Sequence, residues 1–154
     1  MRPACSRLCS CRLAGRPVAC SKMAKRSHRL RLKVPGRTIT ATLIDSEATR
    51  DFVSLLPLTL TMNDLFRREK FGHLPRAIST GGKRTHTYAV GEIAYWAPGP
   101  DVAVYYRDDG EEIPNPGIIV IGRIDSGVEV LDVPGSLRMT IEALDSNTQR
   151  SSHR

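Results

Sequence analysis

Cysteine is absent from the whole sequence after residue 20. The four cysteines lie near the N-terminus, and their spacing does not form the paired CxxC motifs that a structural zinc site usually shows. A protein body without cysteine has no disulfide scaffold, which fits a reducing compartment and leads us to expect a cytoplasmic protein. We predict neither a metal ion nor a cofactor. The cysteines are Cys5, Cys9, Cys11 and Cys20.

Acidic residues are absent from the start of the chain. Residues 1–37 contain eleven Lys and Arg and no Asp or Glu, which leaves twelve basic and all sixteen acidic side chains for residues 38–154, a net charge of −4. The total of +7 therefore comes from the leader. A mildly acidic body without a basic stripe has no electrostatic footprint for a phosphate backbone, so we do not expect nucleic-acid binding.

Long apolar runs are missing as well. Arg7, Arg12 and Arg16 interrupt the leader, so it lacks the roughly 7–15-residue apolar region of a signal peptide. No run approaches the roughly 18 residues of a membrane span. An Arg- and Ser-rich leader leaves an organelle transit peptide open, but the favoured interpretation places the true start near Met23. The expected parts are a disordered basic leader, one folded domain and a frayed tail, at residues 1–27, 28–146 and 147–154.

Alternating apolar residues predict a β-hairpin in residues 29–44. Leu30 and Leu32 share one face, and Pro35-Gly36-Arg37 supplies the turn before the alternation resumes. Residues 45–57 have apolar residues at helical spacing between a Ser/Asp start and a proline stop, which predicts a short amphipathic helix. A strand is expected to follow at residues 58–62.

Residues 63–87 are polar, contain several breakers and show no sustained period. We therefore predict a long irregular connection with a short helical turn at Asp64–Arg68. Residues 79–85 hint at a phosphate loop but lack its first glycine and the Ser or Thr after the lysine. We interpret this stretch as a flexible basic lid over one end of the domain. His73 and His86 are read as surface histidines, because no Asp, Glu or Cys stands at metal-ligand spacing from them.

The second half of the chain is rich in short strands. Many short strands with Gly/Pro turns and one or two short helices predict a mainly β fold, an antiparallel barrel or sandwich. A closed barrel has no exposed edges, and its inward side chains fill the interior. Strands are expected at 93–96, 102–106, 118–124 and 136–144, with an acidic loop at 108–117 and a short turn or helix at 126–131. Arg123, inside an apolar strand, is expected to face outward or to pair with Asp125, because burial without a partner is costly.

Three stretches in this order resemble cyclophilins. Gly36–Leu43 followed by Ala48–Leu55 is similar to the second strand and first helix of that family, and the aromatic strand pair matches the middle of its barrel. Val120–Leu131 looks like the strand, turn and short helix near its C-terminal end. The chain is most similar to the small bacterial cyclophilin-like proteins. The resemblance implies a closed antiparallel cyclophilin-like β-barrel.

The same resemblance implies altered chemistry. Cyclophilins use an arginine to donate hydrogen bonds to the substrate carbonyl and prolyl nitrogen, which weakens the amide resonance behind a barrier of about 18–20 kcal/mol. In the segment Gly91–Pro98 the matching position is Trp96, and the family's glutamine-glycine-glycine segment reads Tyr106-Arg107-Asp108. An indole packs well against a proline ring, but it carries no charge.

The two central strands hold the only tryptophan and three of the four tyrosines. Amphipathic aromatics with a guanidinium suit a ligand-binding face. The alternative is ordinary packing: strand alternation sends neighbouring aromatics to opposite faces, so at most half of them can share one pocket. The predicted ligand-binding residues are Tyr95, Trp96, Tyr105, Tyr106, Arg107 and Arg76.

Three functions remain open on the sequence alone. The favoured one is a module that binds a peptide or a small molecule. The second is a weak peptidyl-prolyl isomerase in which Arg107 or Arg76 replaces the missing cation, although Arg107 beside Asp108 and Asp109 fits a salt-bridged strand end better. The third is a structural subunit, which would expose an apolar patch of more than a few hundred Å².

Overall fold

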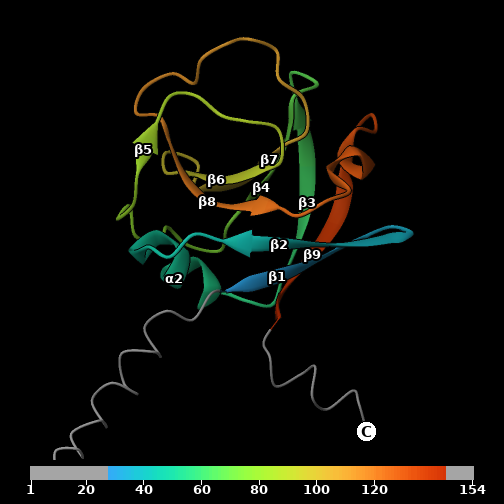
Figure 1. Ribbon diagram of the computed structural model, residues 1–154, viewed down its shortest axis with the longest axis horizontal. Helices are drawn as coiled ribbons and strands as arrows, with labels where there is room; N and C mark the ends of the chain where they lie inside the picture. Colours follow the sequence, from blue (N-terminus) through green and yellow to red (C-terminus); the bar gives the residue numbers. More distant parts are fainter. Residues whose placement is uncertain (1–27, 145–154) are drawn as a thin grey trace, which may run out of the picture.

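The computed structural model describes residues 28–144 (Figure 1). The predicted leader at residues 1–27 and the predicted frayed tail at 147–154 lie outside the described residues. Strands dominate, with one α-helix and one turn of 3₁₀ helix. The elements are β1 (Arg29–Val34), β2 (Arg37–Leu43), α2 (Glu47–Val53), β3 (Leu58–Leu65), β4 (Glu69–His73), β5 (Arg84–Thr85), β6 (Glu92–Trp96), β7 (Asp101–Tyr105), β8 (Ile118–Ile124), η1 (Val128–Leu131) and β9 (Leu137–Leu144).

Eight strands close into an antiparallel barrel, as the resemblance implied. They follow the order β2-β1-β9-β3-β4-β7-β6-β8, and β8 then pairs with β2; the two-residue β5 is added at β8. The closing seam is short, with Thr42 opposite Arg123 and Leu43 opposite Gly122. A Cβ at Gly122 would lie 2.8 Å from the carbonyl oxygen of Thr42, so only glycine permits this approach.

Asp125 fastens the same seam from the end of β8. Its carboxylate accepts hydrogen bonds from the guanidinium of Arg29 at 2.7 Å and from the hydroxyls of Thr40 and Thr42 at 2.8 Å each. Burial alone would raise the pKa of Asp125, but these three donors together lower it. Arg123 faces outward, which confirms the first of the two alternatives predicted for it. Its ion-pair partner is Glu92 at 3.6 Å, and not Asp125 as the second alternative had it.

The predicted irregular connection at 63–87 was wrong over its first part. β3 continues to Leu65 and forms a hairpin with β4, and the predicted helical turn is the tight turn between them. The inner face of β4 carries Lys70 and Gly72 in place of apolar residues, which hid the strand period. Gly72 is required there because a Cβ would lie 2.6 Å from the Sδ atom of Met62.

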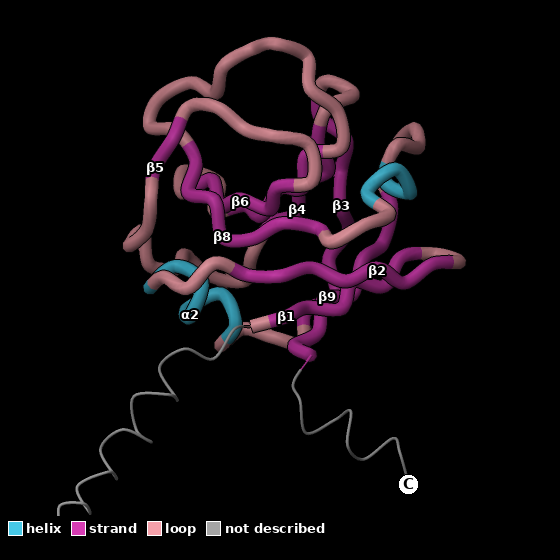
Figure 2. The backbone as a smooth tube through the Cα atoms, viewed as in Figure 1, coloured by secondary structure: helices cyan, strands magenta, loops and turns pink. Residues whose placement is uncertain are grey.

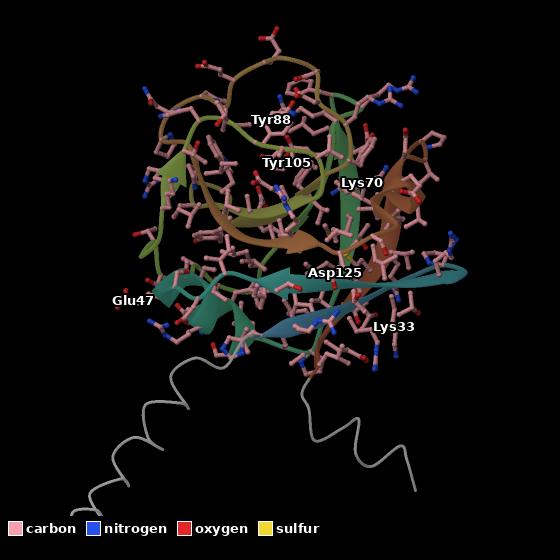
Figure 3. The ribbon with its side chains drawn as sticks, viewed as in Figure 1. Lys33, Glu47, Lys70, Tyr88, Tyr105 and Asp125 are labelled. Atoms are coloured by element: carbon pink, nitrogen blue, oxygen red, sulfur yellow. The ribbon has the colours of Figure 1, made fainter. Side chains whose placement is uncertain are left out.

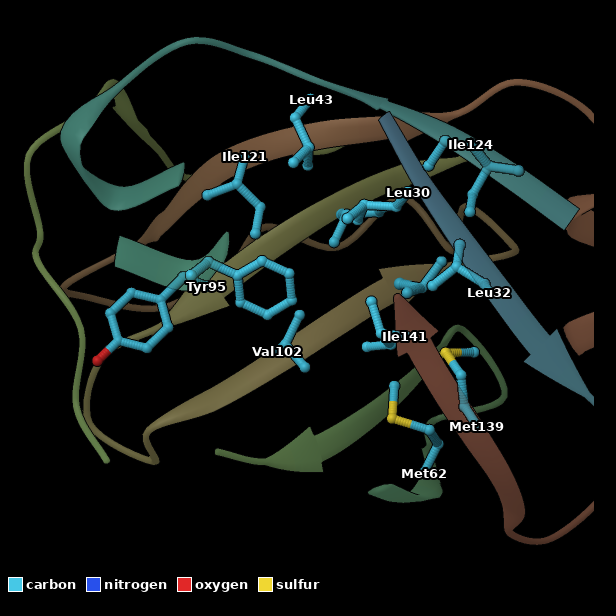
Figure 4. Packing of buried hydrophobic residues seen from close by; sticks show 14 of the residues in the cluster. Leu30, Leu32, Leu43, Met62, Tyr95, Val102, Ile121, Ile124, Met139 and Ile141 are labelled. Atoms are coloured by element: carbon cyan, nitrogen blue, oxygen red, sulfur yellow. The ribbon is translucent and has the colours of Figure 1, made fainter. Parts of the chain in front are cut away.

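The barrel interior is filled by alternate side chains of all the long strands. Figure 4 shows Leu30, Leu32, Met62, Tyr95 and Ile141 converging from β1, β3, β6 and β9, and each is at most 2% exposed. α2 closes one end, since Phe52 is fully buried in the same core and Ser46 caps the helix by accepting the N–H of Thr49. The predicted hairpin and helix at 29–57 are thereby confirmed.

The segment predicted to be a flexible lid is held by hydrogen bonds to α2. The N–H of Ser79 donates to Asp51 at 2.8 Å, and the carbonyl of Gly81 accepts the N–H of Ala48 at 2.9 Å. Gly82 lies against Ile119 of β8, where a Cβ would be 2.9 Å from the side chain. The segment is therefore part of the barrel cap.

None of the described helices is long and apolar enough to cross a membrane. Among residues 28–144, no three His, Cys, Asp or Glu side chains are grouped in a way that could hold a metal ion.

Candidate functional site

Strand alternation divides the predicted aromatic cluster between two faces of the barrel wall. Tyr95 is 1% exposed and points into the core, where its hydroxyl accepts the N–H of Ile78 at 3.1 Å. Trp96, the next residue, lies on the outer face. The expectation that neighbouring aromatics separate is confirmed here, and Tyr95 is part of the core.

The same division applies to the second tyrosine pair. Tyr106 follows β7 into the core, and its hydroxyl donates a short hydrogen bond to Asp64. Burial and that carboxylate raise the pKa of Tyr106 to about 12. Tyr105 lies on the outer face, where burial and the nearby Glu69 carboxylate raise its pKa further.

A second, smaller apolar cluster covers the outer face of β4, β6, β7 and β8. The segments that follow β7 and precede β6 fold over it, and Figure 2 shows these loops above the strands. Figure 3 places Tyr88 and Tyr105 together beneath them. This outer cluster consists of Ala94, Ala103, Tyr105, Ile113 and Ile118, with Phe71, Tyr88, Trp96 and Val120 partly buried against it.

A pocket of about 270 Å³ opens in the outer cluster. Its size lies just below the roughly 300–1,000 Å³ usual for small-molecule sites, so it suits a small ligand or one side chain of a peptide. Ala103 gives it space, because a larger side chain at this position of β7 would fill it. The pocket is lined by Leu65, Phe66, Arg68, Glu69, Phe71, Trp96, Asp101, Ala103, Tyr105, Ile113, Pro114 and Ile118.

A buried ion pair forms the polar part of the pocket wall. Nε and Nη2 of Arg68 donate to the same oxygen of Glu69, at 3.0 and 2.6 Å, and both side chains are 7% exposed. Nη1 of Arg68 lies 3.5 Å from Asp109. The carbonyl of Arg68 also accepts the N–H groups of Tyr106 and Arg107, which ties the covering loop to the β3–β4 turn.

Aromatic rings surround the Arg68 guanidinium. Its carbon lies 5.2 Å from the ring centre of Phe66, 5.3 Å from Tyr88 and 5.9 Å from Tyr105. Tyr88 and Tyr105 stack on each other with ring centres 4.3 Å apart. These contacts fix the cation and the rings relative to one another.

The Glu69 carboxylate has hydrogen-bond donors on only one of its two oxygens. Both hydrogen bonds from Arg68 reach Oε2, and no donor among residues 28–144 reaches Oε1. Burial raises the pKa of Glu69; Arg68 opposes this shift, while the carboxylates of Asp109 and Asp101 add to it. A buried carboxylate oxygen in a pocket wall is therefore left to accept a hydrogen bond.

The β3–β4 turn presents an aromatic ring at the pocket rim. Phe66 and Arg67 have φ angles of 58° and 53°, in the left-handed region that favours glycine, and the N–H of Arg68 closes the turn on Leu65. Phe66 is 70% exposed although it is a large apolar residue. Positive φ at both central residues is the geometry of a type I′ hairpin turn, and this turn holds an exposed aromatic ring beside the pocket.

The two arginines predicted for the site do not line the pocket. Arg107 pairs with Asp132 at 2.7 Å and not with its acidic neighbours in sequence. Arg76 pairs with Asp51 at 2.8 Å, beside α2. Of the six predicted ligand-binding residues, the structure brings together Trp96 and Tyr105.

Sequence reasoning missed the β3–β4 hairpin, which supplies five of the twelve residues that line the pocket. Phe66, Arg68, Glu69 and Phe71 all lie in the stretch that was read as irregular. The signal was present: aromatic residues at 66 and 71 bracket four consecutive charged residues, which is unusual for a solvated loop. His73 is exposed, as expected, and its Nδ1 lies 2.6 Å from Asp101 at the pocket edge.

Residues 28–144 thus form a closed eight-stranded antiparallel barrel with one helix at its end and an aromatic pocket on its outer wall. A model of the cyclophilin-like family matches residues 32–142, and the chain belongs to that family. The match spans the barrel from β1 to β9 and includes the whole pocket.

The fold is also found among solved structures. One example is the solution structure of a hypothetical protein from Archaeoglobus fulgidus, 22% identical in sequence, with a TM-score of 0.63. The alignment covers 78% of this chain and 98% of the archaeal one. No curated protein matches the sequence.

Proposed function

We propose that this protein is a binding module that takes a small molecule, or one side chain of a peptide, into the outer pocket. The observation that carries the proposal is the pocket itself: an apolar, aromatic recess whose wall contains a buried ion pair with an unfilled acceptor. Ligand sites are commonly apolar recesses with a few convergent polar groups. The compartment is proposed to be the cytoplasm, since the described barrel has no cysteine.

The intrinsic fluorescence of Trp96 tests this function directly. Trp96 is the only tryptophan in the chain and it lines the pocket, so its emission reports occupancy. Two-dimensional NMR with a panel of small amines, acids, alcohols and Ala-Pro peptides supplies the same information residue by residue. We expect shifts that cluster on Phe71, Trp96 and Ala103; shifts scattered over the surface would contradict the proposal.

A pair of matched variants separates the pocket from general effects. Ala103→Leu fills the pocket, and Ala143→Leu makes the same change at an exposed position of β9. We expect Ala103→Leu to abolish the shifts and Ala143→Leu to leave them unchanged. Equal binding by both variants would exclude the pocket as the binding site.

A weak prolyl isomerase is the second candidate, favoured by the presence of a buried guanidinium in the pocket wall. In this alternative Arg68 is the catalytic cation, the role for which the sequence suggested Arg107 or Arg76. Two of its N–H groups are engaged by Glu69, which opposes donation to a prolyl amide. Exchange peaks between the cis and trans forms of an Ala-Pro peptide, reduced in Arg68→Lys and unchanged in Arg107→Ala, would support the isomerase. Lysine keeps the charge but loses the forked donor.

A further inference from the structure

We propose that the pocket recognises a primary ammonium group carried on a small apolar body, and that Glu69 is the counter-ion. This inference rests on the proposed function, because it assigns the chemistry of the ligand to the same pocket. It follows from three features of the described residues: a buried acceptor, an excess of carboxylates and aromatic walls.

The buried acceptor is Oε1 of Glu69. The side chain is 93% buried, both Arg68 hydrogen bonds converge on Oε2, and no protein donor within the described residues reaches Oε1. A buried carboxylate oxygen without a donor is costly. A ligand that brings an N–H removes this cost, and a charged N–H does so most strongly.

Carboxylates outnumber cations around the pocket. Arg68 is the one cation among its lining residues, against Glu69 and Asp101, and Asp109 lies at 3.5 Å from the same guanidinium. Asp101 and Asp109 both act on the Glu69 carboxyl by charge repulsion. The covering loop adds Asp108, Glu111 and Glu112. An incoming ammonium lowers this repulsion, whereas an anion increases it.

Arg68 is not available as the receptor for an anion. Its Nε and Nη2 donate to Glu69 and its Nη1 faces Asp109, so its donors point toward protein carboxylates. Its charge is already matched by two acids. A carboxylate or phosphate ligand would have to displace one of them.

The remaining walls suit an organic cation. Phe66, Phe71, Trp96 and Tyr105 present rings to the pocket, and ring faces attract a cation within about 6 Å of their centres. The same rings and the flanking Ile113 and Ile118 cover an apolar body. The volume of about 270 Å³ fits an arylalkyl or short alkyl ammonium ion.

Three probes of nearly equal shape test the charge. Phenethylammonium, 2-phenylethanol and 3-phenylpropionate share an apolar body and carry a cationic, a neutral and an anionic end. We expect Trp96 fluorescence titrations of the full chain at pH 7 to give binding of phenethylammonium at least about tenfold tighter than that of the alcohol, as for one charge-assisted hydrogen bond. The anion is expected to bind more weakly than either.

Glu69→Gln tests the counter-ion, because it keeps the size of the side chain and removes the charge. We expect it to lower the affinity for phenethylammonium to that for the alcohol and to leave the alcohol unchanged. Glu142→Gln is the matched control, since Glu142 lies on β9 and pairs with Arg31 and Lys33 outside the pocket. It removes the same charge and should keep the preference. If Glu69→Gln does not fold, Asp101→Asn supplies the variant, with a smaller loss expected in the same direction.

Two sources could carry the ammonium: a free amine or a lysine side chain of another protein. Butylammonium and the peptide acetyl-Gly-Lys-Gly-amide present the same group alone and within a chain. Preference for the free amine would show that the covering loop encloses the ligand, and preference for the peptide would show that the rim around Phe66 adds contacts.

The outcomes separate this inference from the proposed function. Equal affinities for the three phenyl probes, or tightest binding of the anion, would overturn the ammonium assignment while the pocket still binds ligands. The absence of any response from the three probes would overturn it as well. In that case, shifts on Trp96 with other members of the panel would keep the binding function, and no such shifts would remove both.

Discussion

Glu69 and Lys70 are adjacent in sequence, both charged and both buried, but they serve opposite purposes. Lys70 points to the inner face of β4, where its ammonium donates to Asp64 at 3.2 Å and to the carbonyls of Val133 and Gly135 at 2.6 Å each. Its three donors have three acceptors. Glu69 points to the outer face with one oxygen filled and one empty.

The difference teaches how to distinguish a structural charge from a functional one. A buried charge whose partners are all supplied by the fold holds elements together, here β4, β3 and the segment after η1. A buried charged group with an unpaired atom loses its interaction with water and gains no hydrogen bond in return. This free-energy cost is removed only when a further group, such as a ligand, pairs with that atom. Burial alone, which is nearly equal for the two residues, does not separate them.

The largest expected effect comes from removal of the satisfied charge. Lys70→Met leaves Asp64 without its cation and two carbonyls without a donor in the barrel end. We expect a loss of about 3 kcal/mol or more in the free energy of unfolding, the size usual when one partner of a buried pair is removed. Urea denaturation followed by circular dichroism measures it. A loss below about 1 kcal/mol would mean that Lys70 is dispensable to the fold.

Asp64→Asn removes the carboxylate that pairs with Lys70, so the stability contributed by this hydrogen-bond network no longer depends on the ionisation of residue 64. Burial raises the pKa of Asp64, but the donors Tyr106, Lys70 and the N–H of Arg67 together bring it below the usual 3.8. A lowered pKa contributes stability that is present above about pH 3.8 and is lost as the pH falls through the folded-state value. We expect a loss of about 1.5–3 kcal/mol at pH 7 that shrinks toward pH 3. A constant difference over this range would contradict the assignment.

Glu69→Gln should cost less stability than either change, about 1 kcal/mol, because the glutamine oxygen still accepts from Arg68 and the empty position is not affected. The same variant should lose ammonium binding, as described above. We therefore expect Lys70→Met to lose more stability than Glu69→Gln, and Glu69→Gln to lose more affinity for the ammonium ligand than Lys70→Met. If both variants lost stability equally and both kept ligand binding, the distinction between the two residues would fail.

The smallest effect is expected for Arg107→Ala. Its ion pair with Asp132 is exposed, and exposed pairs contribute little. We expect an unchanged denaturation midpoint and unchanged ligand affinity. A clear loss of affinity would return Arg107 to the site and contradict its assignment to an ion pair outside the pocket.

The sequence predicted the barrel but not the hairpin that completes the pocket. Strands such as β1, β2 and β8 carry apolar residues on the inner face, so their period is visible. In β4 the inner residues are Lys70 and Gly72, one satisfied by a distant turn and the other required by the approach of Met62. Both reasons are tertiary, and no local pattern encodes them.

The candidate site, like the fold, was predictable only as far as local sequence patterns reach. Alternation correctly separated Tyr95 from Trp96 and Tyr105 from Tyr106, but it could not say which member of each pair faces outward. The closure of the barrel determines this orientation. It places Tyr95 of β6 and Val104 of β7 on the inner face, so that their sequence neighbours face outward. The cation of the site was sought at Arg107 or Arg76, although Arg68 comes from the turn before β4, the strand that pairs with β7.

The pairing of β1 with β9 has a consequence for the use of this barrel within longer chains. Arg29 lies opposite Leu144, so the polypeptide enters and leaves the barrel side by side, at the lower end in Figure 1, while the loops over the pocket lie at the upper end. Neighbouring entry and exit points are what allows one domain to be inserted into a loop of another. The barrel could thus be inserted at one point of a host chain, with both junctions at one end and the loops over the pocket at the other.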